Sequence, residues 1–179
     1  MKSSSPPAGK LSVRELTLLP LMGALIFAAK EALYALPNIN INAVLIILCA
    51  IFFGWKGMFS VGIYVMLEGL VNGFSIWWFG YLYTWPLVLA AAMTLRSCRS
   101  ALIWAVFAAV YGLLFGPLMY LEYFAINGGW EMFLTMWVSG IPYDLAHCGG
   151  NFVLTLVLFQ PLYRVMTHFL GDPDKKESP

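Results

Sequence analysis

Apolar residues gather into six stretches along the chain, separated by polar residues or by Gly and Pro. A helix needs about 20 mostly apolar residues to cross the hydrocarbon core of a bilayer, so long stretches of this kind predict membrane-spanning helices. The second stretch is short, and taken alone it would also fit a re-entrant or buried segment. The pattern predicts helices at Leu16–Leu36, Ile41–Phe53, Met58–Phe74, Ile76–Leu95, Ala101–Met119 and Pro142–Met166.

The composition agrees with a membrane location. Of the 179 residues, 61% are hydrophobic and 11% are charged, whereas soluble domains carry about 25% charged residues. The net charge of +1 also lacks the basic footprint of a nucleic-acid-binding protein. These values exclude a soluble enzyme domain, a disordered chain and a nucleic-acid binder. We expect an all-α membrane protein, with a six-helix transmembrane domain at 11–170 between flexible tails at 1–10 and 171–179.

The basic residues predict how the six helices cross the membrane. Cytoplasmic loops collect Lys and Arg, and six crossings with both chain ends inside would place nine of the ten basic residues on that side. The exception is Lys30, which lies within the first stretch. If the second stretch turned back, most of the basic residues would move outside. The sequence therefore predicts a multi-pass membrane protein with both termini in the cytoplasm.

Ionisable and amide side chains lie within the apolar stretches or at their predicted outer ends. They are Lys30, Glu31, Glu68, Asn72, Glu122, Asp144, His147 and Asn151. Such groups are costly in hydrocarbon, so they face the bundle interior or a wet cavity and indicate function. The last three share one helix stripe, because their spacing is i, i+3 and i+7. All eight would lie at mid-depth or nearer the outer surface, which predicts a pocket open to the outside.

Each of these groups also has a purely structural interpretation. Lys30 and Glu68 could neutralise each other across two helices, and His147 could be a hydrogen-bonded core residue. Asp144 could stabilise a helix start after Pro142 through the helix dipole. Asn151 could hold two helices together.

Aromatic residues are concentrated at the predicted outer surface, where they would serve either as an interfacial belt or as pocket walls. The long outer segment 120–141 is expected to be a loop with a short helix at Glu131–Val138. No metal site or disulfide is expected, because Cys49, Cys98 and Cys148 are scattered. We also expect no cofactor. The candidate substrate-binding residues are Asn38, Asn40, Glu68, Asn72, Trp77, Trp78, Tyr81, Glu122, Trp137, Tyr143, Asp144, His147 and Asn151.

The first stretch carries small residues at four-residue spacing: Ala24, Ala28 and Ala32. Small residues in such a row let another helix approach closely, either within the bundle or from a partner protein. The chain has no Gly-rich phosphate-binding loop with its Lys, so we expect no ATP hydrolysis by the chain itself. Two alternatives to a binding subunit remain: a membrane enzyme that uses Asp144 and His147, and a scaffold without a ligand.

Several short segments resemble the substrate-binding S components of energy-coupling factor (ECF) vitamin transporters. They are ALPNI at 35–39, LIIL at 45–48, FG at 53–54, EGL at 68–70, WW at 77–78, YLY at 81–83 and, most specifically, GIPYDLAHCGGNF at 140–152. The similarity covers about 11–169.

The resemblance implies a six-helix subunit of a bacterial-type cell membrane, not itself an enzyme, that captures a vitamin or a precursor with high affinity near the outer surface. It implies a transmembrane coupling protein and two cytoplasmic ATPases as partners, with Ala24 and Ala28 on the contact with the coupling protein. Aromatic walls with carboxylates and a His suit a heteroaromatic or weakly cationic molecule, whereas Lys30 would suit a ligand carboxylate.

Overall fold

The computed structural model describes residues 11–35 and 41–173. This described part is helical and contains no strand. Its elements are α1 (Val13–Ala32), α2 (Asn42–Phe53), a 3₁₀ turn η1 (Gly54–Lys56), α3 (Gly57–Asn72), α4 (Ile76–Met93), α5 (Ala101–Tyr123), a π-helical turn η2 (Phe124–Gly128) and α6 (Gly129–Leu170). The fold is therefore all-α, as the sequence predicts.

Four helical segments among the described residues are long and apolar enough to cross a membrane: Asn42–Asn72, Ile76–Met93, Ala101–Tyr123 and Gly129–Leu170. Every α-helix other than α2 also exposes large apolar side chains, and an apolar surface of this extent requires an apolar environment. These two findings indicate a membrane protein. The crossing of all six helices stays a prediction, because α2 alone, with 12 residues, would be about 18 Å long against a core of about 30 Å.

Helix α2 forms the centre of the bundle. It contacts each of the other five α-helices, and all of its residues from Asn42 to Phe52 are buried. Its sequence agrees with this position, since a helix that is apolar on every side is typical of a protein core or of a membrane span. The other helices pack around α2, and their large buried side chains, such as Val61, Trp85 and Phe159, form the core together with it.

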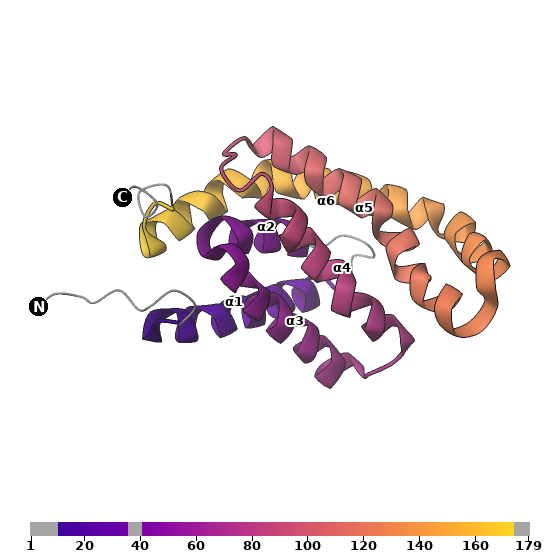
Figure 1. Ribbon diagram of the computed structural model, residues 1–179. Helices are drawn as coiled ribbons and strands as arrows, with labels where there is room; N and C mark the ends of the chain where they lie inside the picture. Colours follow the sequence, from indigo (N-terminus) through magenta and orange to yellow (C-terminus); the bar gives the residue numbers. More distant parts are fainter. Residues whose placement is uncertain (1–10, 36–40, 174–179) are drawn as a thin grey trace, which may run out of the picture.

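The start of α1 and the end of α6 lie at the same end of the molecule (Figure 1). Arg14 donates a hydrogen bond to the carbonyl of Phe169 there. Lys56 and Arg96 line a pocket at this end together with Arg14, so we call it the basic end. The six-crossing prediction places these three residues on one side of the membrane, and the structure places them at one end of the bundle. The last turn of α1, with Lys30, lies at the opposite end.

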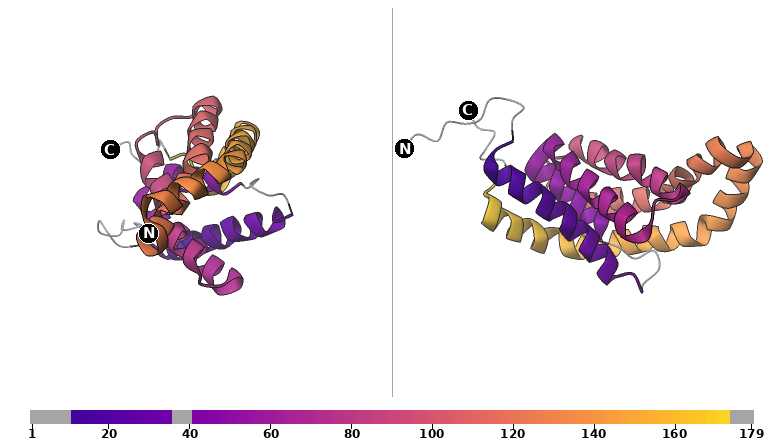
Figure 2. Two further views of the ribbon diagram at one scale, coloured as in Figure 1. Left: turned by 90° about the vertical axis from the view of Figure 1, so that its right-hand side faces the viewer. Right: turned by 90° about the horizontal axis from the view of Figure 1, so that it is seen from below.

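Helices α5 and α6 form a long hairpin whose tip extends away from the other helices (Figures 1 and 2). The prediction of a loop at 120–141 with a short helix at Glu131–Val138 is wrong. Helix α5 continues to Tyr123, η2 makes the turn, and α6 starts at Gly129. Pro117 and Pro142 lie inside the two helices, and proline bends a helix without always ending it. The apolar pattern alone could not separate a bent helix from a loop.

Candidate functional site

Four side chains of α1 and α3 form an ionic cluster at the end opposite the basic end: Lys30, Glu31, Glu68 and Asn72. Lys30 Nζ lies 2.6 Å from Glu68 Oε2 and 3.3 Å from Glu31 Oε1. Asn72 Nδ2 donates to the same two carboxylate oxygens, at 3.1 Å to Glu68 and 3.2 Å to Glu31. One ammonium and one amide thus hold two carboxylates together.

Glu68 is the most deeply buried member of the ionic cluster. Its side chain is 0% exposed, whereas those of Lys30 and Glu31 are 21% and 31% exposed. Its second oxygen, Oε1, has no hydrogen-bond partner among the described residues. A buried carboxylate oxygen without a partner is costly, so it marks a place where a ligand or a water molecule would be stabilising.

Close approach of α1 and α3 brings the ionic cluster together. Ser60 donates its hydroxyl to the carbonyl of Leu19, at 2.8 Å. A Cβ added at Gly23 would lie 2.6 Å from the Ser60 carbonyl oxygen, so only glycine fits at this crossing. One turn of α3 separates Glu68 from Asn72, which places both on the face that meets the end of α1.

A cluster of five aromatic rings lies beside the ionic cluster and connects α3, α4 and α5. We call it the ring cluster: Tyr64, Tyr81, Trp85, Tyr111 and Phe115. Trp85 is at its centre, with ring centroids 5.5 Å from Tyr64, 5.6 Å from Tyr81, 5.7 Å from Tyr111 and 5.8 Å from Phe115. Such separations are typical of favourable edge-to-face and tilted aromatic pairs.

The ring cluster reaches the ionic cluster on one side and α6 on the other. Tyr64 precedes Glu68 by one turn of α3 and accepts a hydrogen bond from Asn42 Nδ2, at 2.8 Å. On the far side, Phe115 packs against His147, with 4.7 Å between ring centroids. Among the described residues, Trp85 Nε1 and Tyr111 Oη are buried without a hydrogen-bond partner. The core of the molecule therefore contains polar aromatic groups with unused hydrogen-bonding capacity.

Asp144, His147 and Asn151 lie on one buried stripe of α6, with exposures of 5%, 2% and 1%. The shared stripe expected from their spacing is confirmed. The stripe faces α5, where Asn151 Nδ2 donates to the carbonyl of Ala108, at 3.2 Å. Asp144 Oδ1 accepts from the backbone N–H of Gly116, at 3.0 Å. Asn151 therefore joins two helices, as its structural interpretation proposes, and Asp144 does the same.

Asp144 does not stabilise a helix start, because it lies inside α6 and that helix begins at Gly129. It instead bonds a backbone N–H next to Pro117, where the regular pattern of α5 is interrupted. Its other oxygen, Oδ2, has no hydrogen-bond partner among the described residues. Asp144 thus joins α5 to α6 through Oδ1 and keeps Oδ2 as an acceptor that a ligand could use.

The remaining candidate residues are spread around these clusters. Trp77 packs on Tyr81, with 5.1 Å between ring centroids, and Trp78 donates its indole N–H to the carbonyl of Val65, at 2.8 Å. Glu122 is buried against α4, where a Cβ at Gly80 would be 3.0 Å from Glu122 Oε2.

Two other candidates are not drawn into the clusters. Tyr143 is 62% exposed, and Trp137 is exposed in the hairpin tip, where its ring packs on Phe133 at 6.0 Å. Asn38 and Asn40 lie outside the described residues.

Sequence reasoning missed the ring-cluster residues of α3 and α5 and the glycines of the α5–α6 contact. A Cβ at Gly112 would lie 2.8 Å from the His147 carbonyl oxygen, and one at Gly116 would collide with the Asp144 carboxylate. The signal was present as Ala108, Gly112 and Gly116 at four-residue spacing, which is a close-packing pattern in membrane helices. Tyr111 and Phe115 are likewise one turn apart.

The small residues of α1 that were expected to meet a partner are at the surface. Ala24, Ala28 and Ala32 are all exposed, so α3 and α2 leave this row uncovered. Within the described residues, no group of three or more His, Cys, Asp or Glu side chains could hold a metal ion.

No family model, curated protein or solved structure matches this chain. The features of the molecule that bear on its function are the ionic cluster, the ring cluster and the exposed row of α1.

Proposed function

We propose that this chain is the high-affinity, substrate-binding membrane subunit of an ECF-type importer for a vitamin or a vitamin precursor. A transmembrane coupling protein and two cytoplasmic ATPases supply the energy, and the chain itself binds and carries the substrate. The observation that carries this proposal is the fully buried carboxylate of Glu68, with one oxygen lacking a partner, beside a cluster of five aromatic rings.

The charged groups of the ionic cluster are costly to bury. Removing a carboxylate and an ammonium from water costs several kcal/mol for each ion, and the attraction between them often fails to recover that cost. A pair that served only stability would be replaceable by apolar side chains of similar volume. Retention of Lys30 and Glu68 within an apolar bundle therefore favours a role in binding.

The two clusters also favour one class of substrate over another. Lys30 already contacts two carboxylates, so it is a poor anchor for a ligand carboxylate. Glu68 Oε1 and Asp144 Oδ2 are acceptors that a ligand N–H or a cationic nitrogen would satisfy. Together with the aromatic rings, they suit a flat heteroaromatic or weakly cationic molecule.

The exposed row of α1 supports the proposed partner. A helix of the coupling protein could pack closely against Ala24, Ala28 and Ala32, because small residues allow backbones to approach. The scaffold alternative relies on this row alone. It predicts that Ala24→Trp destroys function while Asp144→Ala and His147→Ala have no effect.

The test is a thermal-shift screen of the purified protein in detergent against a broad panel of vitamins and precursors. The proposal expects one compound class to raise the melting temperature at nanomolar to micromolar concentrations. Glu68→Gln should abolish the shift, and the matched control Glu131→Gln, an exposed carboxylate of α6, should keep it. Folded protein that no compound stabilises would contradict the proposal.

The enzyme alternative, with Asp144 and His147 as the reacting groups, is separated from transport by product analysis. It predicts turnover of the bound compound without any ATPase partner. Recovery of that compound unchanged after incubation would eliminate this alternative.

A further inference from the structure

Glu122 occupies a buried position between α4 and α5, outside the ionic and ring clusters. It lies in the last turn of α5, and the residue is 6% exposed. A Cβ added at Gly80 of α4 would lie 3.0 Å from Glu122 Oε2 and 2.8 Å from Met119 Sδ. The carboxyl group and the thioether thus lie against the backbone of α4, in space that the missing side chain of Gly80 leaves open.

The carboxyl group of Glu122 has no partner in the part of the chain that the structure describes. Neither oxygen accepts a hydrogen bond with regular geometry, and no described Lys, Arg or His forms an ion pair with it. The backbone N–H of Gly80 approaches the carboxyl group, but it lies inside α4, where such a group already bonds the carbonyl four residues earlier.

The hydroxyl groups of α4 on this side are directed to other acceptors. Tyr83 interacts with Glu122 but donates its hydroxyl hydrogen to the carbonyl of Leu118. Thr84 donates to Met119 Sδ, at 3.8 Å. The two side chains that could satisfy the carboxyl group of Glu122 therefore do not.

The other elements next to α5 supply no charge to Glu122 either. Asp144 and His147 of α6 face a different side of α5, since Asp144 bonds Gly116 and six residues turn a helix by more than half a revolution away from that face. The turn η2 contains no titratable residue, and the titratable residue of α2 is Cys49. Glu122 is thus a buried carboxyl group without a counter-charge.

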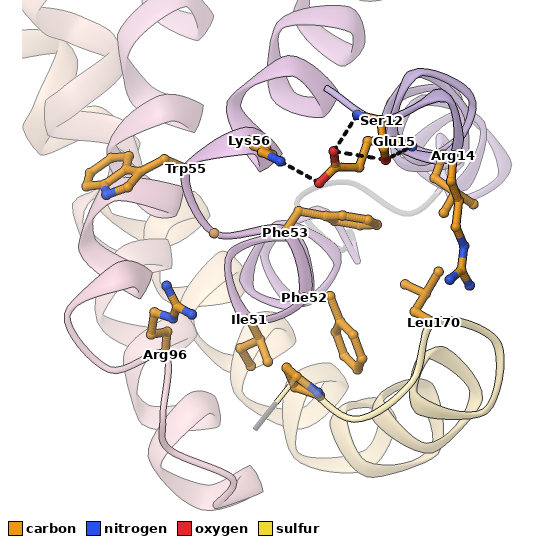
Figure 3. Close-up of a pocket in the computed structure, with 13 residues that line it drawn as sticks. Ser12, Arg14, Glu15, Ile51, Phe52, Phe53, Trp55, Lys56, Arg96 and Leu170 are labelled. Atoms are coloured by element: carbon orange, nitrogen blue, oxygen red, sulfur yellow. Dashed lines mark hydrogen bonds and ion pairs between the residues drawn. The ribbon is translucent and has the colours of Figure 1, made fainter. Parts of the chain in front are cut away.

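Glu15 at the basic end shows what Glu122 lacks. Figure 3 shows Lys56 and Ser12 around the carboxylate of Glu15. Lys56 Nζ lies 2.7 Å from Oε1, and the Ser12 backbone N–H donates to Oε2 at 2.8 Å. A cation and a hydrogen-bond donor thus stabilise the ionised form of Glu15, although Glu15 is less buried than Glu122.

Three ligands could neutralise or satisfy Glu122: a metal cation, a water molecule or a proton. A hard metal cation needs several oxygen ligands, whereas the side chain next to the carboxyl group is a thioether. A buried water needs two to four polar partners, and the nearby hydroxyl hydrogens are already used. A proton needs neither a cavity nor further ligands, and buried carboxylates without partners are commonly neutralised in this way.

We propose that Glu122 is a proton-binding site and is a neutral carboxylic acid in the folded protein at neutral pH. The proton comes from the aqueous phase and stays on the carboxyl group, so that no charge is buried between α4 and α5. Because α4 also carries Tyr81 and Trp85, the bound proton helps to hold the ring cluster in place. This inference does not rest on the proposed transport function.

Infrared spectroscopy of the full chain in lipid nanodiscs at neutral pH tests the proposal. In the spectrum of the wild type minus that of Glu122→Gln, we expect the C=O stretch of a protonated carboxylic acid. The matched control is Glu131→Gln, which removes an exposed carboxylate of α6, and its difference spectrum should contain only carboxylate bands. Carboxylate bands for Glu122 would overturn the proposal. A shift of such bands when sodium replaces potassium would indicate a metal cation instead.

A second variant keeps the test decisive if Glu122→Gln folds poorly. Glu122→Leu places an apolar side chain of similar size in this apolar site, and its difference spectrum should contain the same carboxylic-acid band. If Glu122 is neutral, at least one of the two uncharged replacements should fold as well as the wild type. Loss of the fold in both would count against the proposal. Substrate binding by a folded Glu122→Gln protein is a separate readout, so either proposal can fail without the other.

Discussion

The contact between Lys30 and Glu68 ties the last turn of α1 to the last turns of α3. Because Glu68 is fully buried, loss of its cation leaves a carboxylate that must either stay charged without a partner or take up a proton. We predict that Lys30→Met lowers the free energy of unfolding by about 3 kcal/mol. The combination of Lys30→Met with Glu68→Leu should recover most of this loss, since two apolar side chains need no pairing.

The matched control for this prediction is Lys56→Met at the basic end. Lys56 also contacts a glutamate, Glu15, but both side chains are partly exposed. Loss of such a pair costs about 0.2–1 kcal/mol. Denaturation in detergent, followed by tryptophan fluorescence, measures all three variants. Equal losses for Lys30→Met and Lys56→Met would contradict the importance of burial at Glu68.

Glu15 gives the α1 start a pH dependence. The hydrogen bond from Lys56 Nζ, and then that from the Ser12 backbone N–H, lower the pKa of Glu15 below its ordinary value of 4.5. Since the folded pKa lies below the unfolded one, the carboxylate stabilises the fold fully above about pH 4.5. This stabilisation is lost as the pH falls through the lowered pKa.

We therefore predict that the wild type melts at a higher temperature than Glu15→Gln at neutral pH, and that the difference shrinks below about pH 4. Melting curves across this pH range check the prediction, with Glu131→Gln as the control that shows no such convergence. A difference that stays constant with pH would show that Lys56 does not stabilise the charged form of Glu15.

At the residue scale, the sequence identified the costly polar groups but not their partners. The burial of Glu68, Asp144, His147 and Asn151 follows from their place in apolar helices. The hydrogen bond between Asp144 and the backbone N–H of Gly116 could not be predicted in this way, because it depends on the register between α5 and α6. Asp144 and Asn151 serve helix packing at least in part, as two of the structural interpretations propose.

At the scale of elements, the α5–α6 hairpin depends on glycines that allow the two backbones to meet. A Cβ at Gly112 would press on the carbonyl oxygen of His147, which is backbone and cannot rotate away. We predict that Gly112→Ala destabilises the protein by about 1–3 kcal/mol and shifts the helices apart. Thermal melting in detergent measures the effect.

Gly149 provides the matched control for Gly112. It lies on α6 with no heavy atom within 4 Å of an added Cβ, so Gly149→Ala should be neutral or stabilising by up to about 1 kcal/mol. If Gly112→Ala is tolerated as well as Gly149→Ala, the close contact between α5 and α6 is wrong.

The helix pattern itself was predictable for most of the chain. Helices α2 to α5 begin within a residue of their expected starts, because Asn, Gly, Ser and charged residues interrupt the apolar runs there. The region 120–141 was not predictable in this way. Its aromatic and polar residues suggest a loop. In the structure, the end of α5, the turn η2 and the start of α6 make this region helical. Phe133 packs there between Trp130 and Trp137.

At the scale of the whole molecule, the exposed row of α1 allows the proposed partner contact to be tested separately from the proposed substrate binding. Ala28 is exposed, so we expect a tryptophan there to be accommodated at the surface, where it would obstruct a partner helix. We predict that Ala28→Trp keeps the melting temperature and substrate binding, but abolishes uptake and co-purification of the coupling protein. Loss of substrate binding in this variant would show that the row packs within the bundle instead.

The all-α fold and the membrane character followed from composition and pattern, because few other structures tolerate so many apolar residues. The neighbouring positions of the ionic cluster and the ring cluster could not be predicted from composition and pattern. They depend on the crossing of α1 over α3 at Gly23 and on the central position of α2. The proposed energising partners would be other chains, so this sequence can predict only a surface that would receive them, the exposed row of α1.

The central claim is that buried polar groups around Glu68 hold a small solute. Mass spectrometry of the small molecules released from purified, denatured protein tests it most directly. The account predicts one heteroaromatic compound, near stoichiometric with the wild type and Glu131→Gln but missing from Glu68→Gln of equal fold and yield. Wild-type protein that captures no compound after incubation with cell extract, or a compound retained equally by Glu68→Gln, would contradict it.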